Sequence, residues 1–166
     1  VVGDGRRVPE VVALLDHPWE QEAHDELKSC CGSMEFILRL QGQNSAFASI
    51  VPSAVREFAS DDLEWVIHRQ IYLHRVDAVQ LEYTNMGQYA AEFRRLVCAL
   101  FEHDVYFQSI ARILPGLRGP LRKMTAGWEY LRALRYELRL LPTLDRVQVC
   151  SRENRDFLVS FLPKMA

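Results

Sequence analysis

The chain has 166 residues, of which 49% are hydrophobic and 25% are charged. This composition excludes an intrinsically disordered or fibrous protein, and the length suits one domain with a hydrophobic core of its own. The longest uncharged run, residues 40–55, contains Gln, Asn, Ser and Pro, so we expect neither a transmembrane helix nor a membrane partner.

The net charge of −2 hides an uneven distribution of charge along the chain. Residues 1–104 hold 17 acidic and 9 basic side chains, a net charge of −8, whereas residues 105–166 hold 5 and 11, a net charge of +6. Such an asymmetry is typical of self-association or of an anionic partner. It is equally typical of a domain whose two ends pair with each other, and the sequence leaves these alternatives open.

Helix signals begin near the N-terminus. Pro9 and Pro18 each suit the first turn of a helix, and residues 1–8 are expected to be a flexible lead. The second proline opens an acidic helix over residues 18–31. Residues 34–40 are short and apolar, and their periodicity fits a helix or a strand equally well.

The middle of the chain carries the strongest helix-start signals. A short helix is expected over residues 52–58. After it, Asp61 and Glu64 form a capping-box pattern that begins a longer helix. Asn85 and Gln88 repeat the pattern and open an amphipathic helix, whose apolar residues recur every three or four positions.

The last third of the chain continues with helix signals. Residues 104–114 predict a helix that Pro115 ends. Pro120 begins a long helix that Pro142 ends, and Ser151 is placed to cap a final helix.

Strict apolar–polar alternation is absent over long windows, and we find no internal repeat and no linker longer than about six residues. The sequence therefore predicts an all-α fold, a compact bundle of seven to nine helices in a single domain over residues 1–166. Its acidic half is residues 1–104 and its basic half is residues 105–166.

Searches for catalytic and metal-binding motifs fail. The five histidines form no H-E-x-x-H motif, and His24 with Glu26 matches only half of the zinc-deaminase pattern, because its P-C-x-x-C half is absent. Gly3 and Gly5 open a Gly-rich turn, but Val8 stands where the dinucleotide fingerprint requires its third glycine. We therefore expect no enzyme activity, no metal and no cofactor.

The four cysteines show no C-x-x-C spacing. Cys30 and Cys31 would point about 100° apart on a helix, which is a poor arrangement for a pair of metal ligands. A disulfide framework is typical of shorter secreted chains, so we expect free thiols and an intracellular location, cytoplasmic or nuclear.

Six basic residues cluster on and just before the long helix that begins at Pro120. The last three recur at positions i, i+3 and i+7, which places them on one side of the helix. Arginine binds carboxylate and phosphate groups bidentately, so the cluster is a candidate docking face for an anionic partner. A solvated helix face, partly paired with Glu129 and Glu137, is the alternative. This cluster, called the basic stripe below, comprises Arg118, Arg122, Lys123, Arg132, Arg135 and Arg139.

Two neighbouring segments carry a family resemblance. Residues 80–96 present a glutamine, an apolar residue, a tyrosine and a phenylalanine at short spacing, and residues 113–121 contain a Gly-Leu turn. Together they resemble the C-terminal capsid lobe of retroviral and gypsy-type retrotransposon Gag proteins, although Thr84 stands where the retroviral pattern has a glutamate. The resemblance implies capsid-type self-assembly without catalytic residues. It implies that the structural hinge and core of the lobe are Gln80, Met86, Tyr89 and Phe93.

The sequence thus predicts a non-enzymatic protein-interaction or self-assembly module that docks through helix faces, with a protein partner or a second copy as the occupant. Buried apolar anchors would supply affinity, and charge would supply orientation and rate. The alternatives are a nucleic-acid-binding helical domain that uses residues 118–139, and a Gag-like capsid assembly domain. An enzyme whose polar residues converge only in the folded chain is a further alternative.

Overall fold

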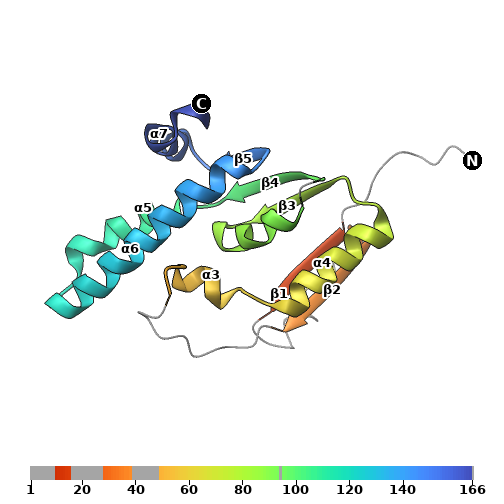
Figure 1. Ribbon diagram of the computed structural model, residues 1–166, viewed down its shortest axis with the longest axis horizontal. Helices are drawn as coiled ribbons and strands as arrows, with labels where there is room; N and C mark the ends of the chain where they lie inside the picture. The colour runs from red at the N-terminus through yellow and green to blue at the C-terminus, as the bar shows by residue number, and fades with distance from the viewer. Residues whose placement is uncertain (1–9, 16–27, 39–48, 94, 166) are drawn as a thin grey trace, which may run out of the picture. The chain divides into compact units, whose positions relative to one another are not determined.

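The computed structural model describes residues 10–15, 28–38, 49–93 and 95–165. These residues belong to two compact units, the first drawn from residues 1–42 and 60–76 and the second from residues 43–59 and 77–166. Each unit contains a parallel sheet, one of two strands and one of three (Figure 1). The predicted all-α helical bundle of seven to nine helices is therefore wrong, and the fold is mixed α/β.

Unit 1 is built on a two-stranded parallel sheet. Strand β1 (Glu10–Leu15) pairs with β2 (Ser33–Leu38) in a register that runs from Glu10 opposite Ser33 to Leu15 opposite Leu38. The segment after Pro9 is a strand rather than a helix, because its Val-Val and Leu-Leu pairs suit a half-buried sheet. Of the undecided segment at residues 34–40, the described residues 34–38 belong to a strand, β2. The acidic helix expected at residues 18–31 lies largely outside the described residues.

Helix α4 (Asp61–His74) packs against β1 in unit 1. It begins as the sequence predicts, and the Ser60 hydroxyl is the cap, accepting the N–H of Leu63 at 3.2 Å. Arg69 and Gln70 on this helix both bind the Glu35 carboxylate of β2. Polar contacts thus complete the packing between helix and sheet.

Unit 2 contains three parallel strands in the order β3-β4-β5. They are β3 (Ala78–Glu82), β4 (Val97–Glu102) and β5 (Arg146–Val149). Because all three are parallel, their carboxyl ends lie at one edge of the sheet (Figure 1). Along the central strand β4, every second side chain is buried, so Cys98, Leu100 and Glu102 face the interior.

The amphipathic helix predicted from Asn85 onward does not exist. Residues Thr84–Glu92 form a 3-10 helix, η1, and the apolar residues after it form β4. The N-cap residue of η1 is Tyr83, and its side chain makes no capping hydrogen bond. The capping box expected from Asn85 and Gln88 is therefore also wrong. A six-residue apolar strand and a short helical segment share the same periodicity, and only the pairing of β4 with its two neighbours distinguishes them.

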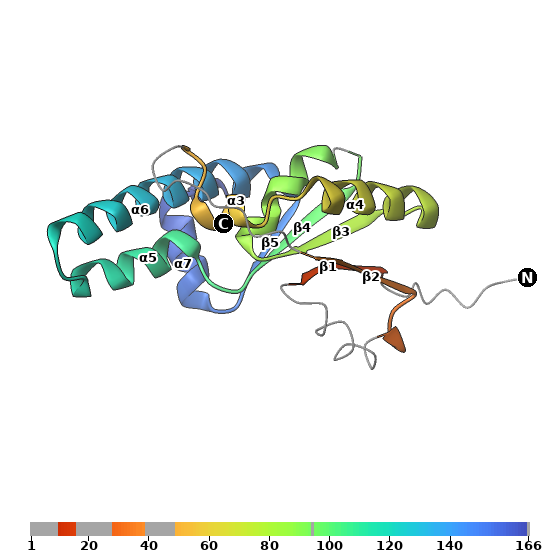
Figure 2. The same cartoon turned by 90° about the horizontal axis from the view of Figure 1, so that it is seen from below.

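The helices after β4 match the sequence prediction more closely. Helix α5 (Tyr106–Ile113), the 3-10 turn η2 (Leu114–Gly116) and α6 (Pro120–Leu140) form an antiparallel hairpin whose closed end points away from the sheet (Figures 1 and 2). A 3-10 turn, η3 (Leu141–Thr143), leads to β5. Helix α7 (Arg152–Phe161) begins at the predicted cap, Ser151, and a last turn, η4, covers Pro163–Met165.

The core of unit 2 lies between the helical hairpin, α7 and the sheet. The ring of Phe107 on α5 is fully buried and packs against Phe157 and Phe161 of α7, with ring centroids 5.4 and 5.3 Å apart. A short helix, α3 (Ser53–Glu57), joins this unit through η1, where the Tyr89 hydroxyl donates to the Phe58 carbonyl at 2.7 Å. None of the helices in the described ranges is both long and apolar enough to span a bilayer.

Candidate functional site

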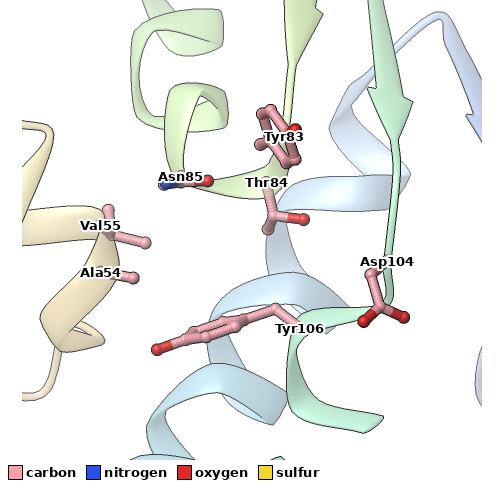
Figure 3. A pocket seen from close by; sticks show the side chains of 7 residues that line it. All are labelled: Ala54, Val55, Tyr83, Thr84, Asn85, Asp104 and Tyr106. Atoms are coloured by element: carbon pink, nitrogen blue, oxygen red, sulfur yellow. The ribbon is translucent and has the colours of Figure 1, made fainter. Parts of the chain in front are cut away.

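The carboxyl ends of β3 and β4 border a small pocket. In parallel α/β sheets, ligands bind just outside the carboxyl ends of the strands, because the loops that follow the strands converge there. The pocket has a volume of about 160 Å³, which is room for several water molecules. Its lining residues are Ala54, Val55, Tyr83, Thr84, Asn85, Asp104 and Tyr106 (Figure 3).

Three segments of unit 2 supply these side chains. Thr84 and Asn85 follow β3, Asp104 and Tyr106 flank the start of α5 after β4, and the apolar wall comes from α3. Figure 3 shows Asn85 and Thr84 above the ring of Tyr106, with Asp104 on the opposite side from α3. The pocket therefore combines an apolar wall with a few polar groups, the usual composition of a small-molecule site.

Tyr83 lies at the rim in an unusual backbone conformation. Its φ of 68° is in a region that side chains other than glycine rarely adopt, at a cost of about 1–3 kcal/mol. The ring stacks on His103, with centroids 4.3 Å apart, and His103 Nε2 lies 2.7 Å from Glu82 Oε2. Strain of this kind clusters at functional sites, so the Glu82–Tyr83–His103 cluster marks this edge as a candidate site.

Two fully buried carboxyl groups lie behind the pocket wall, Glu102 on β4 and Glu137 on α6. The Thr84 hydroxyl donates to Glu102 and lies 3.2 Å from Glu137 Oε1. Glu137 also accepts the backbone N–H groups of Tyr106 at 2.9 Å and of Phe107 at 3.0 Å. Its carboxyl group thus occupies the N-terminus of α5, where unpaired N–H groups need an acceptor.

The two carboxyl groups share a proton. Burial, together with the hydrogen bond and the charge of Glu102, raises the pKa of Glu137 to about 9. Two adjacent buried carboxylates cannot both be ionised at neutral pH, so the pair carries one negative charge. With its pKa at about 9, Glu137 holds a proton at neutral pH and still accepts the two backbone N–H groups, while Glu102 Oε2 accepts no hydrogen bond from the described residues.

A third acidic side chain, Glu129, supports the opposite wall of the pocket. Its Oε1 accepts the N–H and hydroxyl of Ser53 at 2.6 and 2.7 Å and the hydroxyl of Tyr106 at 3.0 Å. Burial acts to raise the pKa of Glu129, but these bonds and the charge of Arg132 outweigh it and lower the pKa. Burial and this carboxylate together raise the pKa of Tyr106 to about 12, so its phenol stays protonated and continues to donate.

The basic stripe lies outside the pocket lining, and its members differ in exposure. Arg132 is only 4% exposed, and its guanidinium binds Glu129 and donates to the Ser49 carbonyl at 2.9 Å. Its charge is therefore paired inside unit 2. Glu137, expected as a surface partner of the stripe, instead binds the start of α5. The exposed members are Arg118, Arg122, Lys123, Arg135 and Arg139.

The residues singled out by the Gag resemblance fall on two elements. Gln80 is exposed on β3, and Met86 is half-buried on η1. Tyr89 and Phe93 are buried. Their placement in a mixed α/β unit does not test the resemblance, which stays a prediction.

Sequence reasoning missed the functional residues of the pocket. Glu102, His103 and Asp104 directly follow an apolar run, a pattern typical of a buried strand that ends at a site. Reading that run as part of a helix concealed the signal. Thr84 was noted only as a departure from the Gag pattern.

The described residues contain no group of three or more His, Cys, Asp and Glu side chains arranged to hold a metal ion. All four cysteines are free thiols, as predicted. No family model matches the chain, and no curated protein and no solved structure shows significant similarity to it.

Proposed function

We propose that unit 2 binds a small molecule in the pocket at the carboxyl ends of β3 and β4. The observation that carries this proposal is the position of the pocket at the edge of a parallel sheet where ligands of α/β proteins bind. The strained Tyr83 at the rim supports it independently. This proposal replaces helix-face docking as the main function.

The size of the pocket limits what enters it. A space of about 160 Å³ accepts one ring or one head group, and a larger ligand would extend past Tyr83 toward His103. Ala54 and Val55 offer apolar contact, while Thr84, Asn85 and Asp104 offer hydrogen bonds that fix the orientation of the ligand. The pocket is supported from behind by buried carboxylates, which hold its walls rigid.

Blocking the pocket tests the proposal. Ala54→Phe would place a ring into the pocket, and Ala59→Phe is the matched control, because Ala59 is exposed and does not line it. A fragment library is screened against the ¹⁵N-labelled full chain by amide chemical shifts. We expect hits that shift residues 83–85 and 104–106, that are lost in Ala54→Phe and that persist in the control. Hits that survive Ala54→Phe, or an absence of hits at these residues, would refute the site.

A second function, self-association, is favoured by the outer face of α6. Four large apolar side chains on this face are exposed at spacings of three and four residues, and two arginines of the basic stripe continue it. No acidic residue occurs between residues 106 and 128. The face comprises Leu121, Met124, Trp128, Leu131, Arg135 and Arg139.

The acidic first half of a second copy is the complementary occupant. Two copies of the α6 face would repel each other, since their exposed charges are all basic. The first turn of α4, in contrast, exposes Asp61 and Asp62 close to Trp65, which is 61% exposed. A basic apolar face of one copy therefore matches an acidic apolar face of another. Such a contact is heterologous, so it would build rings or open chains, and a capsid-type assembly would be one form of it.

Light scattering after size exclusion, over a hundredfold range of concentration, tests self-association. We expect larger species at low salt that shrink in high salt and in Arg135→Glu/Arg139→Glu, but persist in Arg152→Glu, an exposed arginine on α7. A strict monomer under all conditions would refute this second function. Binding of DNA that weakens steeply with salt and depends on the same arginines would favour the nucleic-acid alternative instead.

A further inference from the structure

We infer that the pocket takes a ligand group that donates hydrogen bonds and carries no negative charge, an ammonium or a hydroxyl group, and that it rejects phosphate and carboxylate groups. This inference rests on the small-molecule site proposed above and specifies the chemistry of its ligand. It follows from the direction of the hydrogen bonds in the pocket wall and from the charges behind it.

Three hydroxyl groups line the pocket, and the two away from its rim, those of Thr84 and Tyr106, have already committed their protons, whereas that of the exposed Tyr83 lies at the rim. Thr84 donates its proton to Glu102, and Tyr106 donates its proton to Glu129 at 3.0 Å. Each hydroxyl has only one proton, so both oxygens offer a ligand nothing but lone pairs. A ligand that only accepts hydrogen bonds would find no donor at either position.

Asp104 adds a third acceptor to the lining. Its carboxylate accepts the Ser109 hydroxyl and lies 3.8 Å from the exposed Arg112 guanidinium, too far for a strong hydrogen bond. Ionised carboxylates accept and do not donate, so this group also selects a donor. Asn85 is the one lining side chain among those described that offers N–H groups to a ligand.

The usual anion site of such a sheet is already filled. Phosphate groups in parallel α/β proteins bind at the N-terminus of the helix that follows a strand, where free N–H groups point outward. Here that helix is α5, and its first N–H groups, from Tyr106 and Phe107, donate to Glu137. A carboxyl group of the protein itself thus occupies the position that a phosphate would take.

The charges around the pocket reinforce this selection. Arg132 and Glu129 pair with each other and cancel. Besides this pair, the pocket has the carboxylate of Asp104, which lies 3.8 Å from the Arg112 guanidinium, and the buried Glu102–Glu137 pair behind its wall. The field in the pocket therefore attracts cations and repels anions.

Small probes that differ in charge distinguish a pocket that selects hydrogen-bond donors from one that accepts anions. The ¹⁵N-labelled full chain is titrated at pH 7 with cyclohexylamine, cyclohexanol, cyclohexanecarboxylate and inorganic phosphate. We expect cyclohexylammonium to bind most tightly and cyclohexanol more weakly, both shifting the amides of residues 83–85 and 104–106. Carboxylate and phosphate should leave these amides unchanged up to the same concentration.

A variant identifies the selecting charge. Asp104→Asn keeps the shape of the side chain and should weaken cyclohexylammonium at least about tenfold, the loss expected for a hydrogen bond to a charged group. Cyclohexanol should change by less than about twofold, since a neutral donor gains little from the charge. Asp156→Asn, an exposed aspartate on α7, is the matched control and should change neither probe.

Binding of cyclohexanecarboxylate or phosphate in the pocket as tightly as the ammonium probe would overturn the inference and leave the proposed site standing. Failure of all four probes to shift these amides would overturn the proposed site, and the inference with it. The titration of the unmodified chain decides between these results even where a variant folds poorly.

Discussion

Replacement of Glu102 by Gln should reduce a pH dependence of stability that the buried carboxyl pair creates. The folded chain holds one proton on the Glu102–Glu137 pair, and the unfolded chain releases it at neutral pH. The pKa of Glu137 rises from 4.5 to about 9 on folding, chiefly through burial and then through contact with Glu102. Folding therefore takes up a proton between these two values.

The sign and size of the pH dependence of stability follow from this uptake of a proton on folding. The folded state binds the proton more strongly, so the stabilisation is fully present below the unfolded pKa, falls as pH rises and is lost above about 9. One group contributes a slope of up to ~1.4 kcal/mol per pH unit. Between pH 6 and pH 8 the free energy of unfolding of the unmodified chain should thus decrease by up to ~3 kcal/mol. That of Glu102→Gln should decrease by less, because the substitution removes the contribution of Glu102 to the raised pKa of Glu137 and leaves that of burial.

The amide of Gln is the appropriate replacement because it is neutral and keeps the size and shape of the Glu side chain. Glu137→Gln should behave differently and destabilise the chain at every pH, because Glu137 accepts the Tyr106 and Phe107 N–H groups through both of its oxygens. Only one side-chain oxygen would remain to accept them. Loss of an acceptor for a buried N–H costs about 1–3 kcal/mol.

Urea unfolding monitored by circular dichroism at pH 6, 7 and 8 measures these slopes. Other titrating groups act equally in both chains, so they cancel in the difference between Glu102→Gln and the unmodified protein. Glu153→Gln, an exposed substitution on α7, should follow the unmodified chain throughout. Parallel slopes for Glu102→Gln and the unmodified chain would refute the shared proton.

Three further substitutions test the fold by the same unfolding measurement. Arg132→Ala should lower the free energy of unfolding by about 3–5 kcal/mol, because it leaves the largely buried carboxylate of Glu129 without its charged partner. Arg135→Ala, at an exposed position, should change it by no more than about 0.5 kcal/mol. Equal effects would contradict the different roles of the two arginines. Gly87→Ala should cost about 1–3 kcal/mol, because its Cβ would lie 2.1 Å from Cδ2 of Leu140, and a neutral result would show that this side chain moves freely. Ser60→Ala should cost about 1 kcal/mol through loss of the cap of α4, and an unchanged midpoint would argue against that hydrogen bond.

Local signals in the sequence predict those helix ends that are set by residues nearby in the sequence. Pro120 begins α6, and Ser151 caps α7 with a hydrogen bond to the Asn154 N–H at 3.1 Å. The start of α4 was likewise predicted to within one residue. Caps and first-turn prolines act over three or four residues, which is why a sequence alone reveals them.

The candidate site was beyond the reach of such signals. Thr84, Asp104 and Tyr106 are separated by up to 22 positions in the chain, and the sheet brings them together only because β3 and β4 are parallel. Local patterns offer no reason to connect the segment after β3 with the Glu-His-Asp run at the end of β4. A motif search finds neighbours in sequence, while this pocket consists of neighbours in space.

By itself the sequence determined the α6 and α7 boundaries, the free thiols, the division of charge between the two halves and the clustering of arginines on α6. Only the tertiary structure decided that the apolar run at residues 97–102 is a strand, and that Arg132 and Glu137 are buried while Arg135 is exposed. The physical reason is the range of the forces involved. Capping and helix propensity act within a turn, whereas strand pairing, burial and the shared proton of two carboxyl groups depend on partners that the chain supplies from far away.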